Sequence, residues 1–214
     1  MWEEAGMKQN SGKKRVIVIT GGIGTGKSTV VNIIKNLGFL VLDSDKLVHE
    51  GYNIENDLYY KVIKRFGKEI LNEDNTINRQ RLGKIVFNNN QDLKDLNNIV
   101  HEYVRSKLIE GVNNSNDKVI FLDIPLILES LKDESQYKLE YDEIWLVYVN
   151  EEIQISRLAN RAIKENKNPQ EVLNIIRKQI PISEKVSMVH EVINNEGTIQ
   201  ELEVKVKELL KQKI

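Results

Sequence analysis

The sequence predicts an α/β fold in which helices flank a parallel sheet. Apolar runs of strand length recur at residues 16–19, 39–42, 119–122 and 144–149, and between them the apolar residues follow helical spacing. A glycine-rich stretch, GGIGTGKSTV at 21–30, comes directly after the first of these runs. The chain of 214 residues suits one domain, or one domain with a large insertion, and it is long enough to bury a sizeable core.

The composition excludes several classes of protein. Lys and Arg (31) nearly balance Asp and Glu (32), so the strongly basic surface of a nucleic-acid binder is absent. The lack of cysteine excludes disulfides and thiolate metal sites. The apolar runs fall well short of the ~20 residues that a membrane helix needs. We therefore expect a cytoplasmic monomer without nucleic-acid or membrane partners, in which residues 1–14 form a disordered extension.

The glycine-rich stretch matches the phosphate-loop pattern G-x-x-x-x-G-K-[ST] through Gly21, Gly26, Lys27 and Ser28. Four glycines are expected to let the amides of residues 22–28 point at a nucleotide β-phosphate, next to the positive end of the following helix. Lys27 is expected to bridge the β- and γ-phosphates, and Ser28 to hold Mg²⁺. The ATP-binding residues predicted in this loop are Gly22, Ile23, Gly24, Thr25, Gly26, Lys27, Ser28 and Thr29.

The next helix and strand lead to a pair of aspartates. The helix buries a face that begins at Val30, and Gly38 ends it in the C′ position. Asp43 and Asp45 follow the second strand, where parallel strands place their carboxyl ends beside the phosphate loop. One carboxylate is expected to accept or orient an acceptor hydroxyl, while the other caps the next helix or binds metal-bound water.

Residues 46–116 lack a central strand and contain amphipathic segments, which predicts a helical insertion. Within it, His101 and Arg105 lie one helical turn apart, and the pattern leaves a structural role and a ligand contact equally open for His101. The third strand ends at Asp123, a position from which a carboxylate either contacts Mg²⁺ or water or simply ends the strand. Pro125 is expected to break the strand ladder there.

Residues 151–185 are helical and basic around a turn at NKNPQ (166–170), which predicts a mobile lid. Arg157 and Arg161 lie one turn apart, so a closing lid would bring both to the transferred phosphoryl group; a solvated charged face is the alternative. Thr198 and Glu201 have capping-box spacing at the start of a final helix. Its predicted packing face consists of Ile199, Leu202, Val206 and Leu209.

These segments, in this order, resemble the dephospho-coenzyme A kinase family from about Val16 to Leu210. The resemblance lies first in TGGIGTGKST followed by D-x-D at 43–45. It continues through NRQRLGKIVF with Arg79, HEYVR with His101 and Arg105, DIPLILE with Pro125 and Glu129, SRLANR with Arg157 and Arg161, Gln179, and Asn195. Two positions depart from the family pattern: Glu102 stands in place of Pro, and Val189-His190 in place of Ala-Asp.

The resemblance implies a P-loop NTPase fold in three parts. These are a nucleotide-binding core (15–45, 117–150 and 186–214), an acceptor-binding insertion (46–116) and a lid (151–185). It also implies transfer of the ATP γ-phosphoryl to the ribose 3′-hydroxyl of dephospho-coenzyme A, the last step of coenzyme A biosynthesis, with Mg²⁺.

The resemblance also assigns roles to single residues. The catalytic residues would be Lys27, Asp45 as the base and Arg157 on the transferred phosphate, and the further ATP contacts would be Arg161 and Asn195. The acceptor-binding residues would be Asp43, Asp45, Arg79, His101, Arg105, Pro125 and Leu126. Ser28 would hold Mg²⁺, with Asp43 or Asp123 contributing through water.

Two other functions stay open at this stage. A nucleoside monophosphate kinase would share the loop, the insertion and the lid, but its acceptor site needs arginines that grip a monophosphate, whereas the two aspartates better suit a hydroxyl acceptor. A GTP- or ATP-dependent switch would hydrolyse nucleotide slowly without an acceptor. A guanine-specific switch normally carries N-K-x-D, and the nearest string here, NKNP at 166–169, lacks the Asp.

Overall fold

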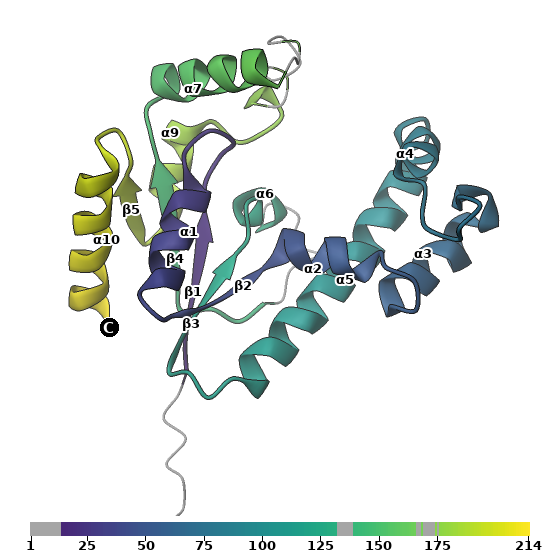
Figure 1. The fold of residues 1–214 in the computed structure, drawn as a ribbon, viewed down its shortest axis with the longest axis horizontal. Helices are drawn as coiled ribbons and strands as arrows, with labels where there is room; N and C mark the ends of the chain where they lie inside the picture. The colour runs from purple at the N-terminus through teal and green to yellow at the C-terminus, as the bar shows by residue number, and fades with distance from the viewer. Residues whose placement is uncertain (1–13, 132–138, 166–167, 169–173, 175) are drawn as a thin grey trace, which may run out of the picture.

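A five-stranded sheet, parallel at every pairing, forms the centre of the molecule (Figure 1). The computed structural model describes residues 14–131, 139–165, 168, 174 and 176–214. The strand order is β2-β3-β1-β4-β5. The strands are β1 (Arg15–Thr20), β2 (Leu40–Asp43), β3 (Val119–Asp123), β4 (Glu143–Tyr148) and β5 (Glu191–Asn194). The α/β class and the four predicted strands are confirmed, with bounds that differ by at most one residue at each end.

Strand β5 is the strand that the apolar pattern did not predict. It pairs with β4 alone, in a register that sets Trp145 opposite Glu191 and Tyr148 opposite Asn194. Of its four residues only Ile193 is buried. An edge strand this short presents too few apolar residues to show as a strand-length run.

The two faces of the sheet belong to two hydrophobic clusters. In β1, Ile17 and Ile19 pack in the cluster that includes helices α1 (Lys27–Asn36) and α10 (Ile199–Lys213). Val16 and Val18 alternate with them and pack on the other face, in the cluster that includes α6 (Ile127–Leu131) and the insertion. Helices therefore cover both faces of the parallel sheet, as such sheets require.

The predicted end of α1 and the predicted start of α10 are confirmed. Helix α1 ends with Gly38 in the left-handed region, at φ 90°. Helix α10 begins with the capping box that Thr198 and Glu201 form. The predicted packing face of α10 was wrong at its start, because Ile199 is 62% exposed. The buried residues are Leu202, Val206 and Leu210, which follow a strict four-residue spacing, and Leu209 is partly buried beside them.

The residues between β2 and β3 are helical, as predicted. They form α2 (Ser44–Gly51), α3 (Asp57–Phe66), the short 3₁₀ helix η1 (Lys68–Ile70), α4 (Arg79–Phe87) and α5 (Asn90–Asn114). Figure 1 shows these helices projecting from the β2 side of the sheet, with the long α5 leading back to β3. Where the family pattern has Pro, Glu102 lies within a continuous α5 and pairs with Lys61 of α3 at 3.1 Å.

The predicted lid is described in part. Helix α7 (Glu151–Lys164) begins at Asn150, whose side chain accepts a hydrogen bond from Ile153 N at 2.9 Å. Helix α9 (Ile182–Lys185) and the 3₁₀ helix η2 (Val186–Met188) lead into β5. Most of the NKNPQ turn, like nearly all of the N-terminal extension, lies outside the described residues. Among the described helices, none has the length and apolar character needed to cross a membrane.

Candidate active site

The phosphate loop runs from the end of β1 at Thr20 to the start of α1 at Lys27. Gly24 and Gly26 have φ of 82° and 84°, a conformation that other residues adopt at a cost. The other two glycines serve a different purpose from the one predicted, because they admit close neighbours. A Cβ at Gly21 would lie 2.8 Å from Thr25 Oγ1, and a Cβ at Gly22 would lie 2.8 Å from Gln154 Nε2.

Three side chains from the C-terminal half of the chain hold this loop. Asn195 Nδ2 donates to Thr25 O at 2.8 Å. Gln154 Nε2 donates to Ile23 O at 2.7 Å, and Gln179 Oε1 accepts from Ile23 N at 3.3 Å. The amide of Thr25 bonds to Gly22 O at 3.2 Å. The prediction that all amides of residues 22–28 point at a phosphate therefore fails at Ile23 and Thr25, which bond within the protein.

Lys27 and Asp123 form an ion pair beside the loop. Their side chains keep only 16% and 7% of their exposure. Burial raises the pKa of Asp123, with a further upward contribution from Asp43 and Asp45, and these effects outweigh the lowering by Lys27. Asp123 is thus more than the end of a strand, because it fixes the lysine at the carboxyl edge of the sheet.

A cavity of about 680 Å³ opens at the carboxyl ends of the strands, between the phosphate loop, α2, α5 and α7. It contains most of the site residues predicted from the sequence. These are Gly22, Ile23, Gly24, Gly26, Lys27, Ser28, Asp45, His101, Pro125, Leu126, Arg157 and Arg161. Asp45, in the first turn of α2, therefore shares a cavity with Lys27 and Ser28, as parallel-sheet topology requires.

Asp43 acts as the cap that the sequence left as one of its possible roles. Its side chain accepts from Lys46 N at 3.0 Å and so begins α2. Asp43 is not among the residues that line the cavity, but it lies opposite Asp123 in the register of β2 and β3. The cap orients the first turn of α2 and with it Asp45.

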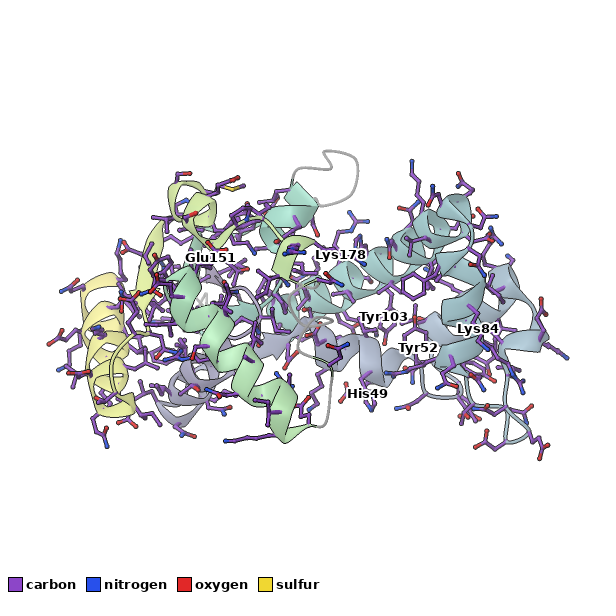
Figure 2. All side chains as sticks on the ribbon, turned by 90° about the horizontal axis from the view of Figure 1, so that it is seen from above. His49, Tyr52, Lys84, Tyr103, Glu151 and Lys178 are labelled. Atoms are coloured by element: carbon purple, nitrogen blue, oxygen red, sulfur yellow. The ribbon has the colours of Figure 1, made fainter. Side chains whose placement is uncertain are left out.

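Six other predicted residues do not line the cavity: Thr25, Thr29, Arg79, Arg105, Asp123 and Asn195. Thr25 and Asn195 are buried and support the loop. Arg79 Nη2 lies 3.1 Å from His49 Nδ1, and its guanidinium lies 5.3 Å from the centroid of the Tyr52 ring. Figure 2 shows His49 and Tyr52 among the helices of the insertion.

The two arginines of α7 both reach the cavity from one face of their helix. Arg157 Nη2 donates to Asn195 O at 2.9 Å, which anchors its guanidinium beside the loop. Arg161 pairs with Glu165 at 2.7 Å, and its side chain is 62% exposed. Arg157 is therefore held in place beside the loop, whereas the side chain of Arg161 extends toward solvent.

Several functional positions were missed by the sequence reading. Gln154 is only 3% exposed although it lies on a charged helix, and its position three residues before Arg157, on the same helix face, was the one available signal. Val48, Val100 and Val104 give the cavity an apolar wall that no motif indicated. His190, which the sequence identified only as a departure from the family pattern, has a structural contact: its Nδ1 accepts a hydrogen bond from Ile144 N at 3.0 Å.

The site offers ligands of the kind that Mg²⁺ prefers. Ser28 carries a hydroxyl in the cavity, and Asp43 and Asp123 carry carboxylates at neighbouring strand ends. Magnesium takes oxygen ligands and keeps several waters, so one hydroxyl with carboxylates at a distance fits it. The residues present therefore fit both the nucleotide phosphates and the ion.

A parallel sheet with a lysine-bearing phosphate loop, an aspartate across the cavity and arginines from a covering helix together define a phosphate-loop kinase. The family model described as dephospho-CoA kinase matches residues 15–201. This chain belongs to the dephospho-CoA kinase family. It is accordingly a kinase of coenzyme A biosynthesis that phosphorylates dephospho-CoA with ATP.

Individual relatives agree with this assignment. Dephospho-CoA kinase from Carboxydothermus hydrogenoformans is 41% identical over 189 residues, which cover 86% of this chain and 87% of the relative. The Aquifex aeolicus enzyme of the same name is 36% identical, covering 92% and 96%. Among solved structures, dephospho-CoA kinase from Campylobacter jejuni has a TM-score of 0.65 at 25% identity, covering 93% and 96%. TT1252 from Thermus thermophilus reaches a TM-score of 0.77 at 28% identity, covering 95% and 100%.

Proposed function

We propose that the γ-phosphoryl group of ATP passes to the ribose 3′-hydroxyl of dephospho-CoA in the cavity between the phosphate loop and α2. The observation that carries this proposal is the position of Asp45, which lines the same cavity as Lys27 and Ser28. An acceptor hydroxyl beside Asp45 is then within reach of a phosphoryl group held by the loop. Transfer needs little more than this alignment and compensation of charge.

On the nucleotide side, Lys27 supplies the positive charge. Its ion pair with Asp123 holds the ammonium at the carboxyl edge of the sheet, where the terminal phosphates would lie. Ser28, with Asp43 or Asp123 through water, would hold Mg²⁺, which when bound neutralises phosphate charge. Arg157, anchored to Asn195 O, is placed to contact the transferred phosphoryl group, and the exposed Arg161 can follow it if α7 closes over the nucleotide.

On the acceptor side, Asp45 orients the hydroxyl and accepts its proton. The cap formed by Asp43 leaves the neighbouring carboxylate of Asp45 exposed at the cavity. His101, Pro125 and Leu126 lie around the acceptor. We place residues 46–116 as the acceptor-binding part, in which Arg79 and Arg105 contact portions of dephospho-CoA that extend beyond the cavity. The lack of cysteine fits a cytoplasmic protein, and we propose that it acts as a monomer.

An ADP-release assay tests the acceptor. The purified protein, with ATP and Mg²⁺, is given dephospho-CoA, AMP, CMP, adenosine or no acceptor. We expect release to be stimulated strongly by dephospho-CoA alone, with the product phosphorylated at the 3′ position by NMR. Stimulation only by AMP or CMP would indicate a nucleoside monophosphate kinase, and slow release independent of any acceptor would indicate a switch.

A further inference from the structure

A buried ion pair joins α6 to α9 outside the cavity. Lys185 is fully buried, and its Nζ lies 2.7 Å from Glu129 Oε1. Within the described parts of the chain, neither Lys185 Nζ nor Glu129 Oε2 has a hydrogen-bond partner, so attraction between the charges holds the pair together. The Glu129 side chain is 21% exposed, and a lysine charge buried against it with so few hydrogen bonds adds little to stability, which points to another role for the pair.

Glu129 has a second contact, which leads toward the phosphate loop. Its Oε1 accepts a hydrogen bond from Ile180 N at 3.1 Å. Ile180 follows Gln179, which lines the cavity and accepts from Ile23 N in the loop at 3.3 Å. Glu129 is thereby linked to the loop through one backbone segment. Figure 2 shows Lys178, the other neighbour of Gln179, between α7 and the insertion in the view from above.

Gln179 is one half of a clamp on the tip of the loop. Gln154, from the first half of α7, donates to Ile23 O, so both backbone groups of Ile23 bond to glutamines. Both glutamines pack on the loop, because a Cβ at Gly22 would lie 2.8 Å from Gln154 Nε2 and 3.2 Å from Gln179 Oε1. The clamp thus holds the part of the loop that must be ordered before the neighbouring amides can bind a phosphate.

The segment that leads into α6, the helix that carries Glu129, is itself fixed to the sheet. Pro125 lies between β3 and α6, and its O accepts a hydrogen bond from Thr20 Oγ1 at 2.8 Å. Thr20 is the last residue of β1 and the point from which the phosphate loop departs. Glu129 is therefore connected to the start of the loop at Thr20 through the α6 backbone, and to the tip of the loop at Ile23 through Gln179.

We propose that Glu129 is a positioning residue for nucleotide binding: together with Lys185 it fixes the backbone at Ile180, so that Gln179 holds the phosphate loop in its binding conformation. The inference rests on the proposed role of the loop as the ATP site. Glu129 does not line the cavity and acts through Gln179. A loop that is ordered before binding loses less conformational entropy when the phosphates arrive, and its affinity is correspondingly higher.

Variants that leave no buried charge test this inference. Glu129→Met/Lys185→Met removes the pair and the acceptor for Ile180 N, whereas Glu129→Gln/Lys185→Met removes the charges but keeps that acceptor. Calorimetric titration with ADP and Mg²⁺ measures nucleotide binding without any acceptor, so its outcome is independent of which acceptor the enzyme uses. We expect the Met/Met variant to bind ADP about tenfold more weakly, and the Gln/Met variant to bind within about twofold of the wild type.

Two further variants separate positioning from general destabilisation. Gln179→Met should weaken ADP binding by a similar factor, and adding it to the Met/Met variant should cause little further loss, because both act on one contact. Arg15→Met breaks the 2.5 Å pair with Glu143 at the opposite end of β1 and should leave ADP binding unchanged.

Four results would overturn the inference. The first is unchanged ADP affinity in Glu129→Met/Lys185→Met, and the second is an equal loss of ADP affinity in Glu129→Gln/Lys185→Met. The third is that the losses multiply when Gln179→Met is added to the Met/Met variant, and the fourth is a comparable loss of ADP affinity in Arg15→Met. If the double variants failed to fold, unchanged ADP binding by Gln179→Met would overturn it by itself.

Discussion

Replacement of Lys27 should have two separable effects, one on activity and one on stability. Lys27→Met removes the charge that acts on the phosphates, and we expect kcat to fall by ~10³-fold or more. If Lys27 pointed only into the phosphate site, the fold would stay nearly intact. The structure adds a cost, because the variant leaves the carboxylate of Asp123, 7% exposed, without its partner.

The size of that cost follows from the burial of the pair. Breaking a buried pair costs ~3–5 kcal/mol, and we take the lower value of about 3 because the Lys27 side chain keeps 16% exposure. For a domain of this size, about 3 kcal/mol corresponds to a Tm lower by ~6–12 °C near neutral pH. Differential scanning calorimetry without nucleotide, in EDTA, measures the change.

The loss of stability should depend on pH in a definite direction. The pKa of Asp123 is raised in the folded protein, and Lys27 is the group that opposes the rise, so the variant raises this pKa further. The folded variant then binds a proton that the unfolded chain, with a pKa of about 3.9, has released. Its stability therefore falls as pH rises from that value through the folded pKa, and the deficit relative to wild type shrinks as pH is lowered.

A second variant isolates the cause. Lys27→Met/Asp123→Asn has no buried unpaired charge, so we expect it to regain most of the lost Tm at neutral pH while kcat stays at least ~10³-fold low. The reasoning is refuted if Lys27→Met is as stable as wild type at pH 7.5, or if its deficit does not change with pH. Retention of most activity would remove the role assigned to Lys27.

Three further outcomes can be checked by kinetics and thermal unfolding. Asp45→Asn should lower kcat by ~10²- to 10⁴-fold at unchanged KM for ATP, and its residual rate should rise with pH if Asp45 is a base. Asp43→Asn keeps a capping oxygen, so its kcat should fall less; if its kcat fell more than that of Asp45→Asn, the roles of the two aspartates would be exchanged. Gly26→Ala, at φ 84°, would place a Cβ against the side-chain amide of Asn195, so we expect ATP binding to be lost and stability to fall by ~2–4 kcal/mol. The control Gly38→Ala, at φ 90° with open space around it, should lower stability by about 1 kcal/mol, and equal losses would contradict this expectation. His190 Nδ1 accepts a hydrogen bond from Ile144 N at 3.0 Å, so His190→Asp, which keeps an acceptor, should retain the wild-type Tm, whereas His190→Ala should lower stability by about 1 kcal/mol. Equal stability of the two variants would show that this hydrogen bond contributes nothing.

Features that depend on neighbouring residues could be predicted from the sequence. The strand–loop–helix order around Lys27, the capping box at Thr198 and the end of α1 at Gly38 are each decided by a few consecutive residues, and these appear as predicted, although two amides of the loop bond within the protein. The parallel sheet was predicted because buried strands read as apolar runs. Its topology then placed Asp45 near the loop, since parallel strands share one carboxyl edge.

Other features were decided only when distant segments came together. The sequence contains no sign that Lys27 pairs with Asp123, 96 positions away, or that Gln154 and Gln179 hold the same residue of the loop. The position of Arg79, beside His49 and away from the cavity, depends on how the helices of the insertion pack. Strand β5 exists because the edge of β4 offers backbone groups for pairing, and a segment of four residues, two of them polar, pairs with them.

The sequence by itself therefore identified the groups that we propose perform the chemistry of this protein: the phosphate loop, the paired aspartates and the arginines of α7. The tertiary structure decided which of these groups meet in one cavity, and which side chains hold them there. The physical reason is that motifs record local backbone requirements. Ion pairs and hydrogen bonds between strands and helices arise from packing, and packing joins residues at any separation along the chain.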